Sequence, residues 1–463
     1  MQLTALPYHS DASHYFEAIR NLAWPLLLDS NQPASHFGRY DIMMANPTAL
    51  IKVSHGQCEI NTGNGFNAAN SDAFTLIAEQ LATFQGIKAE HLEQDLPFYG
   101  GAAGLFGYDY GRELEAMPVK AIKDIELADL WIGIYPWAVV SDHESQQSWF
   151  VSHLDEQDNQ ALLQNLTSAP VANEQEQAFN LLAEFSANMT AEEYADKFAR
   201  VNDYIHAGDC YQVCLAQRFQ SQYKGHPWQA YKQLRQRAPT PFSAYMETDA
   251  GSVLSLSPER FLQVKDLRVE TKPIKGTRPR GATAEQDLAL RDELYNSPKD
   301  RAENLMIVDL LRNDISKECV PGSVAVPDLF AIESYSNVHH MVTTVTGKLP
   351  SKEHILSLLK GAFPGGSITG APKIRAMQII EELEPHRRNA YTGSIGYISC
   401  HGAMDTNILI RTLVTSSSDD STGDIYCWAG GGLVADSNWQ EEYQETFDKV
   451  NNLLKGLQVV KAE

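Results

Sequence analysis

Apolar residues recur at helical spacing in three segments of the second half of the chain. The first segment begins at Thr190, with Glu193 three residues later, and ends at Gly208. A threonine followed by a glutamate at this spacing is a capping box, which marks the first turn of a helix. The apolar positions that follow are Tyr194, Phe198, Val201 and Ile205. The pattern predicts an amphipathic helix over residues 190–208.

A second helix is predicted to start at Ser297, because Pro298 suits the first helical position and Asp300 completes a capping pattern. Glu303 shares one face of this helix with three apolar residues, which are Met306, Ile307 and Leu310. An acid therefore lies on the stripe that is expected to face the core.

A third helix is predicted to begin near Ser437. Its buried face is expected to consist of Trp439, Tyr443, Phe447, Val450 and Leu454. Glu442, Glu445 and Lys449 then form a strip along the shoulder of that face. Each acid could be a solvated flank or a partner of the helix dipole. Two helices that both bring acids toward the core nevertheless indicate a counter-charge, for which a hard divalent cation such as Mg²⁺ is best suited.

The hydrophobic pattern changes once along the chain. Short strand-like runs and a glycine cluster at 100–113 fill the first part, and a polar, acidic stretch typical of a linker follows. Helical and strand patterns alternate after that stretch. The pattern alone suggests an N-terminal part over 1–155, a linker over 156–188 and a second part over 189–463.

Composition narrows the possible functions. The 463 residues include 37 Lys and Arg against 59 Asp and Glu, which gives a net charge of −22. This charge argues against nucleic acid or an anionic membrane as the main partner. The N-terminus lacks the pattern of a secretory leader, and no run of about 18 apolar residues is found, so we expect a cytoplasmic protein. An anionic substrate would then need a metal or a few placed Lys and Arg.

The six cysteines are scattered, as is common in a reducing compartment. Cys210 and Cys214 lie four residues apart, but no second Cys or His pair completes a zinc site, so small buried residues are the better interpretation. The sequence leaves the role of Cys214 open.

Glycines gather in two further segments. Residues 362–376, "AFPGGSITGAPKIRA", lead into a predicted helix and could either bring backbone N–H groups close to an anion or form a tight structural turn. No P-loop spacing is present. Gly430, Gly431 and Gly432 come just before the third helix, and Arg411 is a charge inside a strand-like apolar run. An arginine in such a run usually has an anionic partner.

Lys275 lies in "TKPIKGTRPRG", residues 271–281. From the residue types alone it could be a phosphate clamp, a nucleophile or a surface charge beside a turn.

Six segments resemble, in this order, the chorismate-utilising enzymes. They are PIKGTRPRG, KDRAENLMIVDLLRNDI, YSNVHHMVTTVTG, FPGGSITGAPKIRAM, MDTNILIRT and AGGGLVADSNWQEEYQET. The resemblance spans about 190–455 and reaches the N-terminal half in LLLDS and GLFGYDYGRE. It implies an α+β fold, one large unit with two orthogonally packed, mostly antiparallel sheets flanked by helices. N-terminal strands are then expected to interleave with C-terminal ones, which makes the boundaries given above nominal.

The resemblance also implies a site. It assigns Mg²⁺ ligation to Glu303 and Glu445, with Asp300 and Glu442 holding metal-bound water, and the metal holds the carboxylate on the chorismate ring. It assigns catalytic roles to Lys275, to Glu259 as general acid or base, and to His340. Contacts to the substrate are implied for Ser367, Tyr391, Arg411, Lys449 and the backbone of Gly430, Gly431 and Gly432. The choice of His340 over His339 rests on the resemblance alone, and Glu259 could instead form a surface ion pair with Arg260.

The segment PIKGT resembles the branch of the family that forms aminodeoxychorismate, on the path to p-aminobenzoate and folate. Anthranilate synthases carry alanine in place of Lys275. The resemblance implies a Mg²⁺-dependent aminase of the transaminase class, in which the amine of Lys275 forms a covalent adduct with chorismate before ammonia displaces it. The ammonia is expected from a separate glutamine amidotransferase subunit, in a heterodimer.

Other functions remain open at this point. Anthranilate synthase component I is the nearest alternative, and isochorismate or salicylate synthase is more distant. A non-catalytic, amino-acid-binding regulatory subunit would not need Lys275, Glu303 and His340 together. The segment WPLLLDS resembles the part of anthranilate synthases that forms a tryptophan pocket, with Ser30 as its polar contact. This segment has two interpretations. It could bind tryptophan without a regulatory role, or it could simply pack in the core.

Overall fold

Local sequence signals set the ends of the helices. In α5 (Ala191–His206), the Thr190 hydroxyl accepts from the Glu193 amide at 3.2 Å, and the Glu193 carboxylate accepts from the Thr190 amide at 2.8 Å. In α8 (Pro298–Ser316), the Ser297 hydroxyl accepts from the Asp300 amide at 3.3 Å. Both predicted helices are confirmed, and each cap satisfies amides that have no partner within the helix.

The helix α11 (Trp439–Leu454) is confirmed, and its predicted buried face is confirmed only in part, at Val450. Its buried residues are Glu442, Thr446, Val450 and Leu453, whereas Trp439, Tyr443 and Phe447 are only half-buried. The helix is therefore rotated toward Glu442, and Thr446 on the same face receives a hydrogen bond from the buried amide of Gln217. Glu442 lies on the buried face itself rather than on its shoulder.

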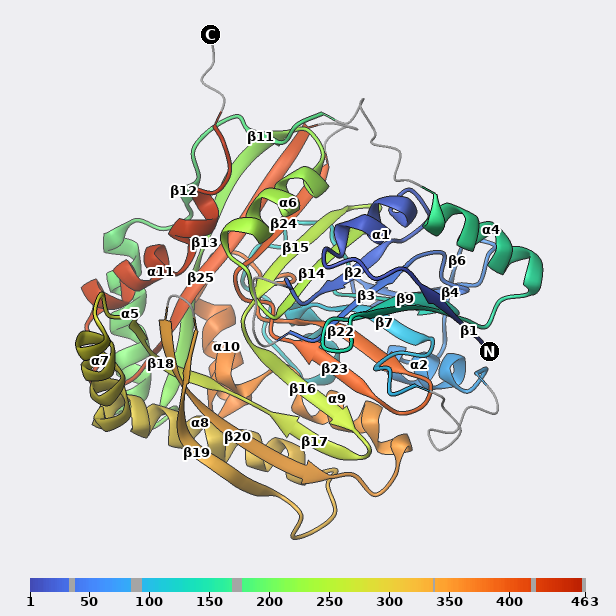
Figure 1. Cartoon of the computed structure of the whole chain (residues 1–463). Helices are drawn as coiled ribbons and strands as arrows, with labels where there is room; N and C mark the ends of the chain where they lie inside the picture. The colour runs from blue at the N-terminus through green and yellow to red at the C-terminus, as the bar shows by residue number, and fades with distance from the viewer. Residues whose placement is uncertain (33–37, 85–93, 169–176, 336–337, 418–421, 460–463) are drawn as a thin grey trace.

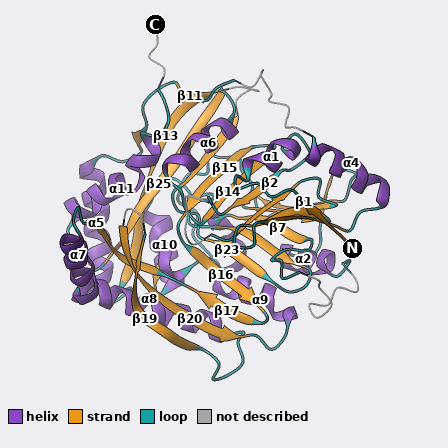
Figure 2. Cartoon of the chain, viewed as in Figure 1, coloured by secondary structure: helices purple, strands orange, loops and turns teal. Residues whose placement is uncertain are grey.

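The computed structural model describes residues 1–32, 38–84, 94–168, 177–335, 338–417 and 422–459 (Figure 1). Helices lie mainly on the outside of the strands (Figure 2). Besides α5, α8 and α11 they are α1 (Ser13–Ile19), α2 (Ala73–Leu81), α3 (Gly111–Leu114), α4 (Glu156–Thr167), α6 (Pro227–Arg237), α7 (Ala284–Asn296), α9 (Ile355–Ala362) and α10 (Lys373–Leu383), with the 3₁₀ helices η2 (Tyr108–Tyr110), η3 (Lys352–His354) and η4 (Gly366–Ile368).

The strands form two large sheets in which every described pairing between strands is antiparallel. The first sheet has the order β1 (Gln2–Leu6), β10 (Gln147–Ser152), β9 (Trp137–Asp142), β3 (Tyr40–Met44), β2 (Leu26–Asp29), β14 (Phe242–Thr248), β15 (Gly251–Ser257), β24 (Thr412–Ser417), β25 (Thr422–Leu433), β13 (Gln212–Lys224), β11 (Asn180–Leu181); β12 (Ser186–Ala187) and β21 (Gly370–Ala371) also pair with β13.

The second sheet has the order β18 (Ile274–Pro279), β20 (Val338–Lys348), β17 (Arg268–Thr271), β16 (Arg260–Lys265), β23 (Met404–Asn407), β22 (Ser394–Ser399), β7 (Gly101–Phe106), β8 (Leu130–Tyr135), β4 (Ala49–Ser54), β5 (Gln57–Asn61), β6 (Phe66–Ala68), and β19 (Ala325–Ser334) pairs with β20. In Figure 1 the long strands β13 and β25 run steeply, whereas β16 and β17 of the second sheet run across them. The predicted α+β class with two large antiparallel sheets is confirmed.

The main apolar core lies between the two sheets. It joins Leu26, Ala244 and Trp428 of the first sheet to Leu105 and Trp131 of the second. Separate clusters fill the outer face of each sheet beneath the helices. Burial of this apolar surface holds the sheets together, and no disulfide joins them in the described residues.

Both sheets contain strands from the first 155 residues and strands from the rest of the chain, but in two contiguous blocks, so the expected interleaving of strands is wrong. In the first sheet β2 pairs with β14, and in the second β7 pairs with β22. The range 156–188 contains helix α4 and the strands β11 and β12, which pair with β13. The arrangement brings residues from distant parts of the chain to one site.

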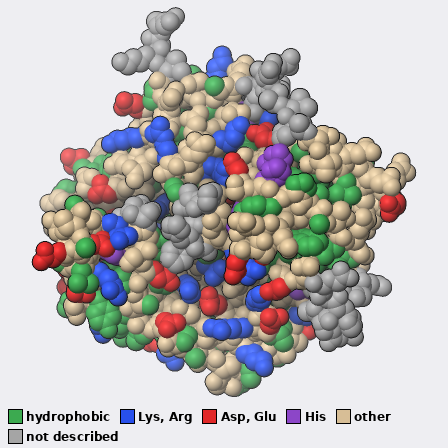
Figure 3. All heavy atoms as spheres, in the orientation of Figure 1, with side chains coloured by type: hydrophobic (Ala, Val, Ile, Leu, Met, Phe, Trp, Pro, Cys, Tyr) green, Lys and Arg blue, Asp and Glu red, His purple; other side chains and the backbone are tan. Residues whose placement is uncertain are grey.

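None of the helices in the described part of the chain has the length and apolarity needed to cross a bilayer. On the face drawn in Figure 3, acidic and basic side chains are interspersed.

Candidate active site

Three predicted catalytic or binding residues meet at one serine. Lys275, in β18, donates from Nζ to the Ser367 carbonyl oxygen at 3.0 Å. Ser367, in η4, donates from its hydroxyl to Glu259 Oε1 at 2.9 Å. Glu259 lies in the turn between β15 and β16. An amine and a carboxyl group are thereby fixed on either side of one serine.

Glu259 is a buried acid. Its side chain is 6% exposed, and burial raises its pKa, although the nearby charge of Lys275 acts in the opposite direction. The alternative of an ion pair with Arg260 is excluded, because Arg260 instead holds Asp405 at 3.0 Å. A carboxyl group with a raised pKa can hold a proton near neutral pH and release it during a reaction.

The two adjacent histidines face different surroundings. His340, in β20, shares a hydrogen bond of 2.8 Å between its Nδ1 and the Thr277 hydroxyl. Burial, together with the charge of Arg411, lowers the pKa of His340 to about 4, so this imidazole is neutral at pH 7. His339 instead contacts Asp287 at 3.0 Å and Ser334 at 2.8 Å. The structure therefore brings His340, and not His339, toward Arg411.

Arg411 is a cation without an anionic partner among the residues that the structure describes. Its side chain is half-buried, and its guanidinium makes no hydrogen bond or ion pair with any residue that the structure describes. Burial alone lowers its pKa, which shows that the charged form is held at a cost. The backbone of Arg411 has a φ of 50°, in the left-handed region that is rare for an arginine. An incoming carboxylate would satisfy this charge.

Tyr391 and the glycines of β25 surround the same region. The ring of Tyr391 stacks on Trp428, with centroids 6.1 Å apart and planes 9° apart. A Cβ on Gly431 would come within 2.7 Å of Glu442 Oε2, and one on Gly432 would come within 2.6 Å of Gln212 Nε2. Glycine at these positions therefore lets the acids of α11 and the amide of Gln212 approach the strand.

Lys449 contacts Gly430, the remaining glycine of the three. Its Nζ donates to the Gly430 carbonyl oxygen at 2.8 Å and lies 2.5 Å from Glu445 Oε1. The charge of Lys449 also lowers the pKa of Glu259, which places this lysine near the Lys275 site.

The four acids predicted to bind a metal come from α8 and α11. Burial raises the pKa of Glu303, and the neighbouring acids Asp300 and Glu445 raise it further. Burial likewise raises the pKa of Glu442, again with a contribution from Glu445. The carboxylates of the two helices are thus close enough to repel one another.

These acids have the chemistry that a hard cation prefers, because mutual repulsion of buried carboxylates is relieved by a divalent ion. In the described residues, however, no three acidic, His or Cys side chains are grouped closely enough to hold a metal ion. Glu445 is engaged by Lys449, Asp300 accepts from Arg278 at 3.2 Å, and Glu442 accepts from Ser437 at 2.7 Å. Binding of a metal would require these contacts to be exchanged.

Arg388 is a residue of this region that the sequence did not predict. This side chain is 1% exposed and donates to both oxygens of Glu384, to the carbonyls of Ile368 and Cys214, and to the hydroxyl of Thr392. It joins η4, β13 and the segment that carries Tyr391, which also lies against its guanidinium. The only signal in the sequence is the pair of arginines in "PHRRNAY". This signal is weak, because adjacent arginines are usually solvated.

The glycine-rich segment before α10 has two roles. Lys373, at the first residue of the helix, forms an ion pair of 2.7 Å with Asp314, so this helix start has a structural partner. Ser367, six residues earlier, reaches the Lys275 site. The structural turn and the site therefore occur in one motif.

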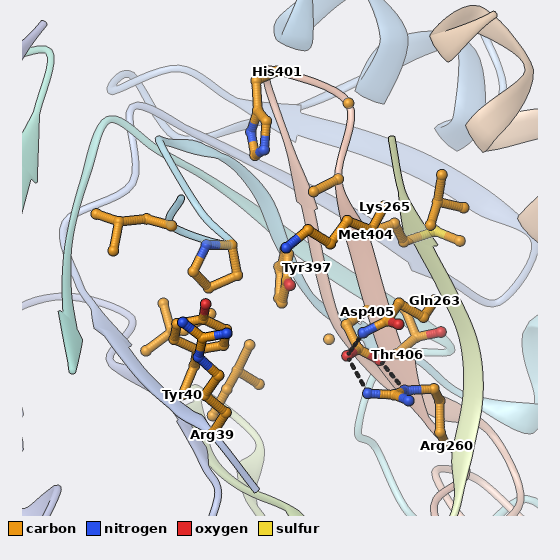
Figure 4. A pocket seen from close by; sticks show the side chains of 18 of the residues that line it. Arg39, Tyr40, Arg260, Gln263, Lys265, Tyr397, His401, Met404, Asp405 and Thr406 are labelled. Carbon is orange, nitrogen blue, oxygen red and sulfur yellow. Dashed lines mark hydrogen bonds and ion pairs between the residues drawn. The ribbon is translucent and has the colours of Figure 1, made fainter. Parts of the chain in front are cut away.

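A separate cavity of about 940 Å³ lies between the sheets, and Ser30 lines it. Arg39 and Tyr40 form one wall in Figure 4, and Arg260 and Gln263 reach Asp405 on the other. The Ser30 hydroxyl and amide both donate to Asp41 Oδ1 at 2.7 Å. None of the predicted catalytic, metal-binding or chorismate-binding residues lines this cavity, so it is distinct from the Lys275 site.

Comparisons with known proteins agree with the motifs. A family model for chorismate binding enzymes matches residues 26–455. The chain is 50% identical over 458 residues to aminodeoxychorismate synthase component 1 of Klebsiella aerogenes, covering 98% of this chain and 99% of that protein. It is 46% identical over 456 residues to the protein of the same name from Escherichia coli (strain K12), covering 98% of each.

Among solved structures, the fold is similar to anthranilate synthase component I from Streptococcus pneumoniae TIGR4. The TM-score is 0.78 at 30% identity, and the match covers 91% of this chain and 93% of that one. The family resemblance carried by the six motifs is confirmed.

Proposed function

Because the chain belongs to the family of chorismate-binding enzymes, we propose that it converts chorismate and ammonia to 4-amino-4-deoxychorismate. The contact between Lys275 and the Ser367 carbonyl carries this proposal. The site holds an amine where the resemblance implies alanine in anthranilate synthases. Use of chorismate follows from the family, whereas the product depends on what this amine does.

The proposed reaction has two displacements. The uncharged amine of Lys275 attacks ring carbon C2 while the hydroxyl on C4 leaves. Glu259 donates its proton to that hydroxyl, which departs as water, and then takes the extra proton from the new C–N bond. Ammonia next forms a bond to C4, the bond between C2 and the lysine nitrogen breaks, and one proton of the ammonia passes to that nitrogen, which regenerates the amine of Lys275. The sum is chorismate plus ammonia giving 4-amino-4-deoxychorismate plus water.

The geometry supports these roles for two residues. Ser367 lies between the nucleophile and the acid, because its carbonyl accepts from Lys275 and its hydroxyl donates to Glu259. This holds the amine in place before substrate binds, which favours attack.

The remaining residues bind and orient the substrate. Arg411, which has no partner among the described residues, pairs with one carboxylate of chorismate. Lys449, Tyr391 and the backbone of β25 contact the other. His340 is neutral because its pKa is about 4, so it acts near the ring as a hydrogen-bond partner or base rather than as a cation.

Mg²⁺ would be held by Glu303 and Glu445, with Asp300 and Glu442 binding its water. When bound, the ion supplies positive charge that offsets the carboxylates of both the protein and the substrate.

We further propose that ammonia reaches this site from a separate glutamine amidotransferase subunit in the cytoplasm. The relatives are named component 1, which is consistent with a second component. The product would lead to p-aminobenzoate and folate.

The cavity at Ser30 would hold tryptophan without regulating the enzyme. Aromatic and apolar residues such as Tyr40, Phe242 and Met404 line it together with charged groups, as suits an aromatic amino acid.

The test is to incubate the purified chain with chorismate, Mg²⁺ and ammonium and to identify the product by mass and fluorescence. Accumulation of 4-amino-4-deoxychorismate supports the proposal. Formation of fluorescent anthranilate, or of isochorismate without incorporation of nitrogen, would contradict it.

A further inference from the structure

Cys214 lies in the wall of the Lys275 site. Its thiol donates to the Ser367 carbonyl oxygen at 3.8 Å, which is the same oxygen that accepts from Lys275. Its charge in the deprotonated form raises the pKa of Tyr391, so the thiol is also close to that ring. The nucleophile, the tyrosine and the thiol therefore surround one small region.

A buried acceptor without a partner lies beside this thiol. Gln212, two residues earlier on the same face of β13, is 1% exposed and donates from Nε2 to Cys214 Sγ at 3.5 Å. Its Oε1 has no hydrogen-bond partner among the described residues. An unsatisfied amide oxygen in so buried a position indicates that a polar ligand enters here.

The other cysteines differ from Cys214 in exposure or position. Cys210, Cys319, Cys400 and Cys427 are buried. Cys58 is half-buried like Cys214, but it lies in β5, far along the second sheet from β18, and burial raises its pKa. Thiols buried in apolar surroundings react slowly, because the reactive form is the thiolate.

We propose that Cys214 is a modification site of the enzyme, at which small thiol-directed electrophiles and peroxides react and thereby block Lys275. An alkyl halide forms a C–S bond at Sγ as halide leaves, and the thiol proton goes to solvent. Hydrogen peroxide transfers one oxygen to give the sulfenic acid, and the second oxygen leaves as water. Either group would occupy the space next to the Ser367 carbonyl that positions Lys275.

The experiment uses the full chain and iodoacetamide, with labelling of each cysteine followed by peptide mass spectrometry. Cys214 should be labelled at least about tenfold faster than the four buried cysteines. Chorismate with Mg²⁺ should slow labelling of Cys214 and leave labelling of Cys58 unchanged. These readouts do not depend on the product, so they hold even if the proposed aminase activity fails.

Activity provides the second readout. Enzyme activity, compared with the untreated rate of the same variant, should fall in proportion to labelling of Cys214 in the wild type and in Cys58→Ala. Cys214→Ala should have the same activity after treatment as before it. If the alanine variant does not fold, Cys214→Val, which fills the same space, is used in its place. Hydrogen peroxide followed by dimedone should mark the same residue.

Three results would overturn the inference. One is labelling of Cys214 no faster than that of the buried cysteines. Another is labelling that chorismate does not slow, and the third is equal inactivation of Cys214→Ala and wild type.

Discussion

Replacement of Arg411 by methionine should weaken chorismate binding without lowering stability. The guanidinium is half-buried and has no partner among the described residues, so the free enzyme gains nothing from its charge. Burial lowers its pKa, which means that the folded state disfavours the charged form. Methionine keeps most of the apolar stem and removes that charge.

The magnitude follows from the one interaction that is lost. A hydrogen bond between a charged donor and a carboxylate contributes about 1.5–3 kcal/mol. At about 1.4 kcal/mol for each factor of ten, the dissociation constant for chorismate should rise about 10- to 150-fold. The free energy of unfolding of the substrate-free protein should stay equal or rise, because an unpaired buried charge is removed.

Arg388 provides the matched contrast. Its side chain is as buried as those of the apolar core, and its guanidinium is fully hydrogen-bonded. Two of these hydrogen bonds go to Glu384, at 2.6 and 2.9 Å. Arg388→Met leaves Glu384 buried without its cation, which should destabilise the protein by about 3–5 kcal/mol. The half-buried Arg375, which pairs with Asp209 in an ion pair 34% and 40% exposed, controls for loss of a charge nearer the surface.

The assays are equilibrium titration with chorismate in Mg²⁺ without ammonia, and urea unfolding of the free protein. The expected pattern is weak binding with intact stability for Arg411→Met, low stability for Arg388→Met, and neither effect for Arg375→Met. Unchanged chorismate affinity in Arg411→Met, or a loss of stability comparable with that of Arg388→Met, would refute the reasoning.

Three further predictions concern catalysis and pH. Lys275→Ala should lower formation of 4-amino-4-deoxychorismate by several orders of magnitude while chorismate still binds. Wild-type enzyme that is denatured during turnover without ammonia should show an adduct on the Lys275 peptide by mass spectrometry. Near-normal activity of the variant would argue against covalent catalysis. Glu303→Gln should abolish turnover at every Mg²⁺ concentration with the fold intact by circular dichroism, because it removes a charge needed to balance the metal, and activity near wild type at low Mg²⁺ would contradict this. His340 should reduce stability in acid: its pKa of about 4 in the folded state lies below the ordinary value of about 6.5, so the unfolded chain binds the proton first and stability falls as pH falls through this window. From pH 7.5 to pH 5 the loss from this group is about 2 kcal/mol, and urea unfolding of His340→Gln should show a smaller acid loss; an equal loss would mean that His340 titrates normally.

The sequence by itself determined the local elements and the family. The caps at Thr190 and Ser297 involve residues within three positions of each other, so their helices were predictable at the correct ends. The ordered motifs carried the family resemblance, and the fold class followed from that resemblance. The role of Lys275 as a candidate nucleophile also came from its motif.

Only the tertiary structure decided which side chains share a site. The carbonyl of Ser367 gathers Lys275 and Cys214 from strands that lie 61 positions apart in different sheets. The rotation of α11, which buries Glu442, also places Thr446 against Gln217 of a distant strand. Periodicity reports which face of a helix is apolar, but contacts and burial depend on packing between segments far apart in the chain, as does the lack of a partner for Arg411 among the described residues.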